Sequence, residues 1–599
     1  MSTSHVGQDL GFDRDALRAK YRAERDRRIR PDGNAQYRRA SGEFGYYADD
    51  PYTEPVIREP LHDRVEVVVV GGGFGGLLTG ARLRQAGVEG IRMIEEAGDF
   101  GGTWYWNRYP GIHCDIESYV YLPLLEELGY VPEWRYAPGE EIRQHAMAIG
   151  RHFDLYRDAC FQTKVTGLRW DDSESEWILD TDRGDRMRAR HVVVSSGTLS
   201  RPKLPGIPGI ETFQGHTFHT SRWDYGYTGG DANGNLHALA GKRVGLIGTG
   251  ATAIQVVPHL GRDAEQLYVF QRTPSSVDVR DNRRTDPEWA ATLTPGWQRR
   301  RMDNFLTIVS GGHAEEDLVG DGWTGSAQLL RKLLPNAETR LSGEEREEID
   351  EVVDFQKMNE IRARVDAVVA DPATAELLKP WYRYMCKRPT FSDHYLQTFN
   401  RPNVTLVDTA DHGGVERMTE NAVVVGGRAY EVDCVIFATG FEVGVSGVLS
   451  GLLPVYGRDG VSLLEYWGQG PRTLHGFSSH GFPNLFHLGP LQNASAVNFV
   501  HILDEQSAHI AAIVGEARKR EARYVEPSAE AERAWVATIR EKAADQYKFQ
   551  AECTPGYYNN EGKPRQQSNS YGDGPVAFHD VLRRWRTEGG MDDVMVDAR

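Results

Sequence analysis

Two glycine-rich loops are the parts of this chain whose residue types and spacing most directly indicate chemistry. The first loop carries Gly71, Gly73 and Gly76 in the pattern GxGxxG, and Phe74 follows the second glycine. Glycine lets the backbone turn tightly and approach a pyrophosphate, whose charge is stabilised by the N-terminus of the helix behind the loop. A single GxGxxG is weak evidence, but this copy stands between a predicted strand and a predicted helix, as the motif requires.

The second loop carries Gly248 and Gly250, with Thr249 between them and Ala253 in the place of the third glycine. Alanine is an allowed variant at that place, and this loop also stands between a predicted strand and a predicted helix. We therefore expect the chain to bind two dinucleotides.

The residue at the end of the next strand distinguishes the two sites. Glu95 lies 24 positions after Gly71 and Arg272 lies 24 positions after Gly248, so equivalent positions carry opposite charges. A carboxylate there accepts hydrogen bonds from a free ribose 2′-hydroxyl, whereas an arginine suits a 2′-phosphate. The first site is therefore predicted to hold FAD or NAD, and the second NADP. The alternative is that Arg272 is only a surface residue at a strand end.

The number and spacing of the cysteines indicate which group accepts the electrons from the flavin. A chain with both sites can pass hydride from NADPH to a flavin, and disulfide reductases of this layout then use a nearby cysteine pair. Five scattered cysteines, at positions 114, 160, 386, 434 and 553, form no CxxC. We interpret them as reduced, without a disulfide framework or a dithiol centre, and expect oxygen to be the electron acceptor. No metal-ligand spacing is complete, so no metal site is predicted.

Alternating strands and helices must position these loops. A β-branched run at 65–70 predicts a buried parallel strand, followed by a helix at 77–86 and a strand at 91–95. A second unit of the same kind spans 242–271. The sequence therefore predicts an α/β fold with two Rossmann-like dinucleotide-binding domains, one for FAD and one for NADP.

The character of the sequence changes along the chain and suggests a division into domains. Residues from about 280 to 385 lack apolar strand runs and carry long helical patterns, which predicts a helical insertion in the NADP domain. Strand-like runs return at 404–408, 422–427 and 433–440. The predicted division is an N-terminal extension (1–60), the first part of the FAD domain (61–200), the NADP domain (201–430), and the second part of the FAD domain with a C-terminal segment (431–599).

The overall composition narrows the classes of function. The chain has 599 residues, enough for two or more domains, and 40% hydrophobic and 26% charged residues, an ordinary globular balance. Its net charge of −17 opposes binding to nucleic acid and to anionic membrane surfaces. No apolar run approaches the ~20 residues that span a bilayer. The N-terminal segment lacks an apolar signal core, so we expect a cytoplasmic protein.

The segment between the two loops carries a further pattern, FQGHTFHTSRWD at 213–224. It resembles the FxGxxxHxxxW(P/D) fingerprint of type I Baeyer–Villiger monooxygenases through Phe213, Gly215, His219, Trp223 and Asp224. Related flavin-containing and N-hydroxylating monooxygenases share the Phe, Gly and His but usually end otherwise. In the family this stretch lies at the linker between the FAD and NADP domains, where His219 would couple cofactor binding to domain rotation. Packing within the linker is the alternative for His219 and Trp223.

Three other segments agree with the resemblance, which runs from about residue 62 to 580. GTWYWNRYPGIHCD (102–115) looks like the family's second signature, FATGFE (437–442) resembles its ATG segment, and CKRPTFSDHYLQTFNRPNV (386–404) resembles the stretch with the catalytic arginine. The second signature supplies further candidate cofactor-binding residues, namely Gly102, Thr103, Trp104, Tyr109 and Asp115.

The resemblance implies a reaction of a ketone with NADPH, FAD and O₂. NADPH reduces FAD, O₂ adds at the flavin C4a to give a peroxyflavin, and its attack on the carbonyl inserts one oxygen atom to form an ester or lactone. Arg388, oriented by Asp115, would stabilise the peroxide and the oxyanion of the adduct. Lys387 would assist Arg272 and Thr273 in holding the 2′-phosphate. Alternatively, Arg388 and Asp115 form a structural ion pair and Lys387 is a solvated lysine.

One departure from the family pattern concerns the C-terminal loop. Many family members carry a tryptophan shortly before a GKPR-like stretch, on a mobile loop that closes over NADP. Here the sequence is ECTPGYYNNEGKPR (552–565), which has no tryptophan. The sequence therefore does not identify the residue that makes this contact with NADP. The loop and the N-terminal extension resemble the subgroup that acts on bulky ketones, such as macrocyclic, steroid or polycyclic terpenoid ketones.

Two other functions remain as alternatives. An N- or S-oxygenating flavin monooxygenase would use the same cofactors on a soft nucleophile and would not need Arg388. A non-catalytic NADPH-binding sensor would show no flavin turnover. The oligomeric state, monomer or dimer, is left open.

Overall fold

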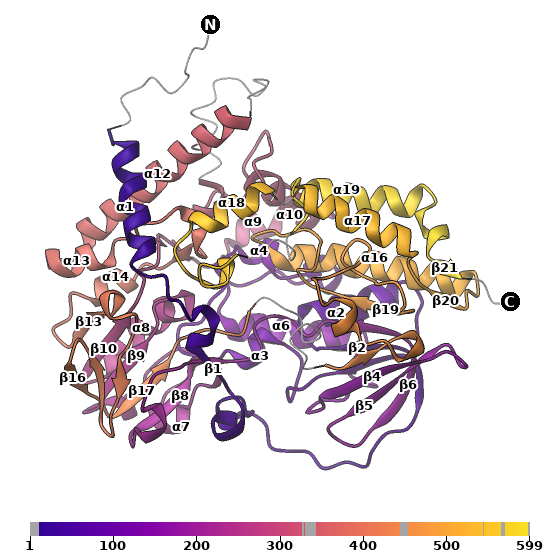
Figure 1. The fold of residues 1–599 in the computed structure, drawn as a ribbon, viewed down its shortest axis with the longest axis horizontal. Coiled ribbons are helices and arrows are strands. Elements are labelled where there is room, and N and C mark those ends of the chain that lie inside the picture. The colour runs from indigo at the N-terminus through magenta and orange to yellow at the C-terminus, as the bar shows by residue number, and fades with distance from the viewer. Residues whose placement is uncertain are drawn as a thin grey trace, which may run out of the picture.

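Two β-sheets lie side by side and organise the chain (Figure 1). They belong to a computed structural model, which describes residues 11–325, 329, 343–443, 453–542, 544–564 and 570–596.

The larger sheet has seven strands in the order β18-β4-β5-β6-β2-β3, with β19 also paired to β6. β2 (Arg64–Val70) lies between β3 (Ile91–Ile94) and β6 (Arg186–Val194), and the three strands run parallel. The strands predicted at 65–70 and 91–95 are therefore confirmed. The centre of β2 is wholly buried, as expected for a parallel strand covered on both faces.

An antiparallel hairpin and two late strands complete this sheet. β4 (Val165–Asp171) and β5 (Glu176–Thr181) extend it beyond β6. β18 (Val455–Tyr456) and β19 (Leu485–His487) return to it from the last third of the chain. The larger sheet is thus built from two separate stretches of sequence.

The smaller sheet has five parallel strands in the order β13-β10-β9-β17-β8. Its strands are β8 (His216–His219), β9 (Arg243–Ile247), β10 (Gln266–Gln271), β13 (Val404–Asp408) and β17 (Cys434–Phe437). β17 pairs with β9 and β8, so the chain leaves this sheet after Phe437 and not at 430 as predicted. The predicted boundary is too early because the strand run at 433–440 fits either sheet, and only the pairing decides.

The described part of the predicted insertion is largely helical. Its helices are α9 (Pro287–Ala291), α10 (Trp297–Val309), α12 (Gly343–Val368) and α13 (Pro372–Leu378). The apolar stripe of α12 packs inward through Ile349, Val352, Val353, Ile361 and Val365. Three more helices lie over the larger sheet at the upper right of Figure 1, α16 (Phe499–Lys519), α17 (Ala529–Lys542) and α19 (Gly574–Thr587).

The N-terminal extension is ordered on the body of the molecule. α1 (Arg14–Asp26) lies along α12, and its Arg18 forms an ion pair of 2.5 Å with Glu351 (Figure 1). β1 (Tyr37–Arg39) pairs antiparallel with β7 (Lys203–Pro205), which lies in sequence between β6 of the larger sheet and β8 of the smaller sheet. The extension therefore reaches the junction between the two sheets.

One prediction about the cysteines is wrong. Cys386 and Cys553 form a disulfide between residues 167 positions apart, with Cα atoms 5.1 Å from each other. The spacing of the cysteines could not reveal this pair, because only the tertiary fold brings the C-terminal loop onto the segment at 386. Cys114, Cys160 and Cys434 are buried free cysteines.

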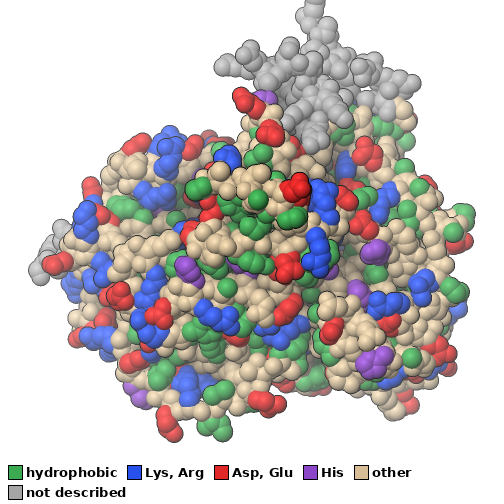
Figure 2. Space-filling view, turned by 180° about the vertical axis from the view of Figure 1, so that it is seen from behind, with side chains coloured by type: hydrophobic (Ala, Val, Ile, Leu, Met, Phe, Trp, Pro, Cys, Tyr) green, Lys and Arg blue, Asp and Glu red, His purple; other side chains and the backbone are tan. Residues whose placement is uncertain are grey.

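Acidic and basic side chains are interspersed on the face of the molecule seen in Figure 2. The negative net charge is therefore not gathered into a single patch on that face. No helix in the described part of the chain is long and apolar enough to cross a membrane.

Candidate active site

One cavity of about 2510 Å³ collects most of the predicted site residues. Both glycine-rich loops, the second signature and the segment at 385–388 contribute to its wall. The predicted residues that line it are Gly71, Gly73, Phe74, Glu95, Gly102, Thr103, Trp104, Tyr109, Asp115, Gly248, Thr249, Gly250, Arg272, Thr273, Lys387 and Arg388. Gly76, Ala253 and the five fingerprint residues are not on the wall.

The first loop connects β2 to α2 (Phe74–Gln85) and presents a helix N-terminus to the cavity. Gly73 is the N-cap of α2, and no side chain caps the free N–H groups of the first turn. These donors suit a pyrophosphate. A Cβ on Gly76 would lie 1.9 Å from the carbonyl oxygen of Gly71, so the third glycine allows close packing of helix on strand.

Glu95 stands at the end of β3, beside this loop. Its carboxylate accepts hydrogen bonds from the backbone N–H groups of Gly72 and, at 2.7 Å, Ala97. Burial raises the pKa of Glu95 to about 7, although the two backbone donors oppose the shift. A ribose hydroxyl of a bound dinucleotide would supply a further donor to this carboxylate.

The second loop repeats this arrangement between β9 and α8 (Ala251–Asp263). Gly248 has φ +112°, and a Cβ there would lie 2.5 Å from the carbonyl oxygen of Ala438, so only glycine fits. Gly250 is the uncapped N-cap of α8, and a Cβ there would meet nothing within 4 Å. The loop therefore leaves open space at the helix N-terminus for a second pyrophosphate. Ala253 is fully buried in the packing behind it.

Arg272 lies at the end of β10, and its guanidinium is already engaged. Nη2 lies 2.9 Å from Oε2 of Glu561, and Nη1 donates to Oε1 of Gln36 at 2.7 Å. Thr273 follows, and its buried hydroxyl has no hydrogen-bond partner among the described residues. Lys387 completes the predicted group and donates to the carbonyl oxygen of Pro555 at 3.2 Å. The prediction did not include Glu561, and no motif could have indicated it.

Arg388 and Asp115 meet on the cavity wall, as the resemblance implied. Nε and Nη2 of Arg388 each lie 3.4 Å from Oδ2 of Asp115. The other carboxylate oxygen accepts from Nη2 of Arg280 at 2.5 Å. Asp115 thus joins two arginines, of which Arg388 keeps 37% of its side chain exposed and Arg280 only 9%. Sequence reasoning missed Arg280, which stands in no family motif quoted above.

The aromatic residues of the second signature form the wall near the first loop. Trp104 donates from Nε1 to the hydroxyl of Tyr121 at 3.0 Å, and Tyr109 donates to Oε1 of Gln255 of α8 at 2.9 Å. A Cβ on Gly102 would lie 2.6 Å from Cα of Gly73, so the signature packs directly on the glycine loop. The second signature therefore touches elements of both dinucleotide-binding loops.

The fingerprint residues contact neighbouring parts of the protein and do not line the cavity. His219 is the last residue of β8 and is fully buried, and burial lowers its pKa to about 3, so the imidazole is neutral near pH 7. Trp223 donates from Nε1 to Oγ1 of Thr228 at 3.0 Å, and Asp224 caps the following short helix by accepting from N of Tyr227.

The first two fingerprint residues pack on each other. A Cβ on Gly215 would lie 2.4 Å from the ring of Phe213 and 2.7 Å from the carbonyl oxygen of Asp433, so a larger residue would not fit. The stretch thus belongs to the edge strand of the smaller sheet and its continuation, and it lies behind the cavity wall.

The C-terminal loop carries two tyrosines where the family pattern has a tryptophan. Tyr557 and Tyr558 line the cavity, with ring centroids 4.5 Å apart. They are the aromatic residues of this loop that face the site.

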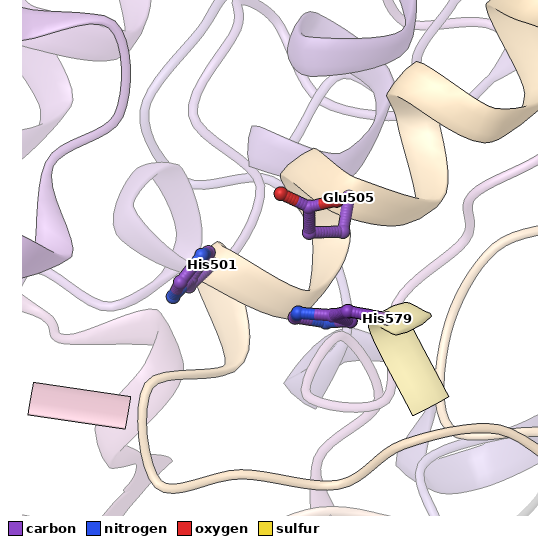
Figure 3. Close-up of side chains that lie close together, drawn as sticks. All are labelled: His501, Glu505 and His579. Carbon is purple, nitrogen blue, oxygen red and sulfur yellow. The ribbon is translucent and has the colours of Figure 1, made fainter. Parts of the chain in front are cut away.

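A separate group of side chains has the composition of a metal site. His501 and Glu505 of α16 and His579 of α19 place candidate ligand atoms within 4.8 Å of one another (Figure 3). However, the guanidinium of Arg299 lies 2.5 Å from Oε1 of Glu505 and 2.9 Å from Asp303. An arginine already balances this carboxylate, and we assign no metal to the group.

Two helix N-termini that face one cavity, with a carboxylate after one loop and an arginine after the other, define an oxidoreductase with two dinucleotides. A family model described as pyridine nucleotide-disulphide oxidoreductase matches residues 65–293. A Baeyer–Villiger monooxygenase of Streptomyces coelicolor is 61% identical over 97% of this chain and 96% of its own length. The chain belongs to the Baeyer–Villiger monooxygenases.

Two further comparisons agree with this assignment. The neopentalenolactone D synthase of Streptomyces avermitilis is 53% identical over 97% of this chain and 99% of its own length. The solved structure of a polycyclic ketone monooxygenase from Thermothelomyces thermophila has a TM-score of 0.89 at 39% identity, with 97% and 98% of the two chains covered. The chain is an FAD- and NADPH-dependent oxidoreductase that inserts one oxygen atom beside a ketone carbonyl.

Proposed function

We propose that this chain oxygenates a bulky polycyclic ketone with O₂ and that Arg388, held by Asp115, is its catalytic arginine. The observation that carries this proposal is the position of Arg388, which keeps 37% of its side chain exposed on the cavity wall while its partner Asp115 is 7% exposed. A structural ion pair alone would not require an accessible guanidinium.

The charges around Asp115 suit this role. Bound FAD, once reduced, supplies the electrons for the reaction of O₂ with the ketone. The carbonyl oxygen of the ketone gains negative charge in that step, and a fixed guanidinium stabilises it. Burial opposes the charge of Arg388, but Asp115 and the other groups around the guanidinium together outweigh burial and raise its pKa. Because Asp115 also pairs with Arg280, the three groups keep a net positive charge.

The two dinucleotides are assigned to the two sheets within this proposal. The first loop and Glu95 would hold FAD on the larger sheet. The second loop would hold the pyrophosphate of NADP on the smaller sheet, with Arg272, Thr273 and Lys387 at the 2′-phosphate. The NADP unit would then extend from about 201 to the end of β17 at Phe437.

The substrate class rests on the relatives and on the cavity wall. One relative is named for a lactone, the product that a cyclic ketone gives in this reaction, and another for polycyclic ketones. Apolar side chains on the wall suit a fused ring system. They include Ile112, Ile116, Val443, Leu491, Val497 and Phe499. The cytoplasmic location expected from the sequence stays part of the proposal.

The test is product identity under ¹⁸O₂ for the wild type and Arg388→Ala. Each enzyme is supplied with FAD, NADPH and a panel of polycyclic and monocyclic ketones, amines and sulfides. We expect labelled lactone from the polycyclic ketones, and a loss of about 10²- to 10³-fold or more in Arg388→Ala while NADPH oxidation continues. Arg300→Ala, an exposed arginine on α10, is the matched control. Undiminished lactone formation by Arg388→Ala would refute the assigned role, and labelled N-oxide or sulfoxide alone would favour the N- or S-oxygenating alternative.

A further inference from the structure

The pocket around Arg272 holds more positive charge than a single carboxylate balances. We call Arg272, Lys203 and Lys387 the cationic pocket. Lys203 lies with Nζ 3.7 Å from the centre of the Tyr37 ring, and it lines the same cavity as the other two. Neither lysine directly contacts a carboxylate in the described part of the chain. Both are partly buried, which makes an anionic partner valuable.

Glu561 is the anion that the chain itself supplies to this pocket. Its side chain is 3% exposed, with Oε2 2.9 Å from Arg272 and Oε1 accepting from the hydroxyl of Tyr37 at 3.1 Å. Burial opposes the charge of Glu561, but Arg272, Lys203 and Lys387 outweigh it and lower the pKa of the carboxyl. Glu561 therefore stays ionised in a place that suits a bound phosphate.

We propose that Glu561 occupies the 2′-phosphate subsite as an internal anion, which NADP must displace in order to bind. This rests on the proposed function, in which Arg272 receives the 2′-phosphate. The carboxylate would thereby lower the affinity for NADP, and its displacement would move the C-terminal loop.

Glu561 and a bound 2′-phosphate would compete for the N–H donors of Arg272. Nη2 faces Glu561 and Nη1 faces Gln36, so a phosphate that binds both terminal nitrogens competes with these two partners. Gln36 is neutral, whereas a carboxylate beside a phosphate dianion is a contact of like charges at low exposure. Glu561 is therefore the partner that leaves.

The C-terminal loop holds Glu561 in a disfavoured backbone conformation above a covalently fixed base. Glu561 has φ +56°, a left-handed conformation that is unfavourable for residues other than glycine, asparagine and aspartate. Nζ of Lys563 donates to the carbonyl oxygen of Pro31 at 2.6 Å, an exposed contact. At the base, Cys553 is covalently joined to Cys386. The ion pair thus helps to hold a locally disfavoured backbone in place.

The experiment measures the dissociation constants of NADP⁺ and NAD⁺ for the FAD-loaded enzyme by isothermal calorimetry. We expect Glu561→Gln to bind NADP⁺ about tenfold more tightly, because the competing charge is removed, and to leave NAD⁺ binding within twofold of the wild type. Tyr37→Phe, which removes one hydrogen bond to Glu561, should shift the NADP⁺ constant in the same direction by less. Glu552→Gln, an exposed carboxylate just before the loop, is the control and should change neither constant.

Arg272→Ala separates failure of this inference from failure of the proposed function. If Arg272→Ala weakens NADP⁺ binding while Glu561→Gln leaves it unchanged or weakens it, Glu561 orients Arg272 and the inference is overturned. If Arg272→Ala has no effect on NADP⁺ binding, the 2′-phosphate assignment fails and takes the inference with it. Melting temperature and flavin content of each variant establish that it is folded.

Discussion

Asp115 shows how a single residue can be predicted while its environment is not. The second signature indicates Asp115 and the segment at 386–404 indicates Arg388, because each stands in a recognisable motif. Arg280, which holds the other carboxylate oxygen, is 165 positions from Asp115 in sequence. Its importance is visible only in the fold, which brings the start of the helical insertion against Asp115. A catalytic pair inferred from motifs is here a group of three charges.

The two lysines of the cationic pocket predict the pH dependence of NADP⁺ binding. Burial lowers the pKa of Lys203 and of Lys387 to about 8, from a usual value of 10.5. A lysine is charged below its pKa, so the pocket loses positive charge as the pH rises through about 8, and affinity for the phosphate falls. The phosphate itself is a dianion above about pH 6. The charged and titratable groups that act on the two lysines are Arg28, Arg272, Glu442 and Glu561.

We therefore expect NADP⁺ affinity to be highest between about pH 6 and 8 and to decline above this range, with NAD⁺ affinity nearly flat. Isothermal calorimetry from pH 6 to 10 measures both. An NADP⁺ affinity that is constant up to pH 10 would mean that neither lysine senses the phosphate.

At the scale of elements, the disulfide joins the C-terminal loop to the segment that bears Lys387 and Arg388. Cys386 directly precedes Lys387, and Cys553 begins the loop that carries Glu561. A disulfide that closes so long a stretch of chain typically contributes about 2–4 kcal/mol to the free energy of unfolding. The pair therefore constrains both sides of the proposed NADP subsite together.

We expect dithiothreitol to lower the melting temperature of the wild type and to weaken its NADP⁺ binding, because the base of the loop is released. A double variant, Cys386→Ser with Cys553→Ser, should behave like the reduced wild type and should not respond to dithiothreitol. Differential scanning calorimetry with and without the reductant measures this. If dithiothreitol lowered the melting temperature of the double variant as much as that of the wild type, the reductant would act at a site other than this disulfide.

Strands that are buried on both faces could be predicted from the sequence, whereas partly exposed strands could not. The continuous apolar runs of β2, β9 and β10 are covered on both faces, and they stand out in the sequence. β4 and β5 are not named by the sequence analysis. β4 alternates buried and exposed residues, and the hairpin turns at Ser175, which has a positive φ of 56°. A strand with the pattern of β4 resembles polar surface sequence, and only the pairing of the hairpin with β6 identifies it as part of the larger sheet.

At the scale of the whole molecule, coenzyme binding should stabilise the fold in a manner that depends on the 2′-phosphate. A ligand that binds only the folded state at 100 times its dissociation constant adds about 2.7 kcal/mol to the free energy of unfolding. The second loop, the cationic pocket and the C-terminal loop, which are far apart in sequence, all line one cavity. A coenzyme bound in that cavity would therefore contact segments that are distant in sequence and stabilise their arrangement.

We expect NADP⁺ to raise the melting temperature of the FAD-loaded enzyme more than NAD⁺ does at the same concentration. The difference should shrink in 0.5 M NaCl, because salt screens the contact between phosphate and cations. Thermal shift measurements at low and high salt test this. Equal stabilisation by NADP⁺ and NAD⁺ at low salt would contradict a 2′-phosphate site at Arg272.

The two dinucleotide units, the family and the predicted site residues, most of which lie on the cavity wall, could be inferred from the sequence alone, because their motifs are local. A glycine loop between a strand and a helix, or a charge at the end of a strand, acts within one short segment. The tertiary structure alone decided what depends on distant segments that meet. It placed Arg280 on Asp115, Glu561 on Arg272 and Cys553 on Cys386. Each of these pairs is separated by more than 160 positions, so no local pattern could record it.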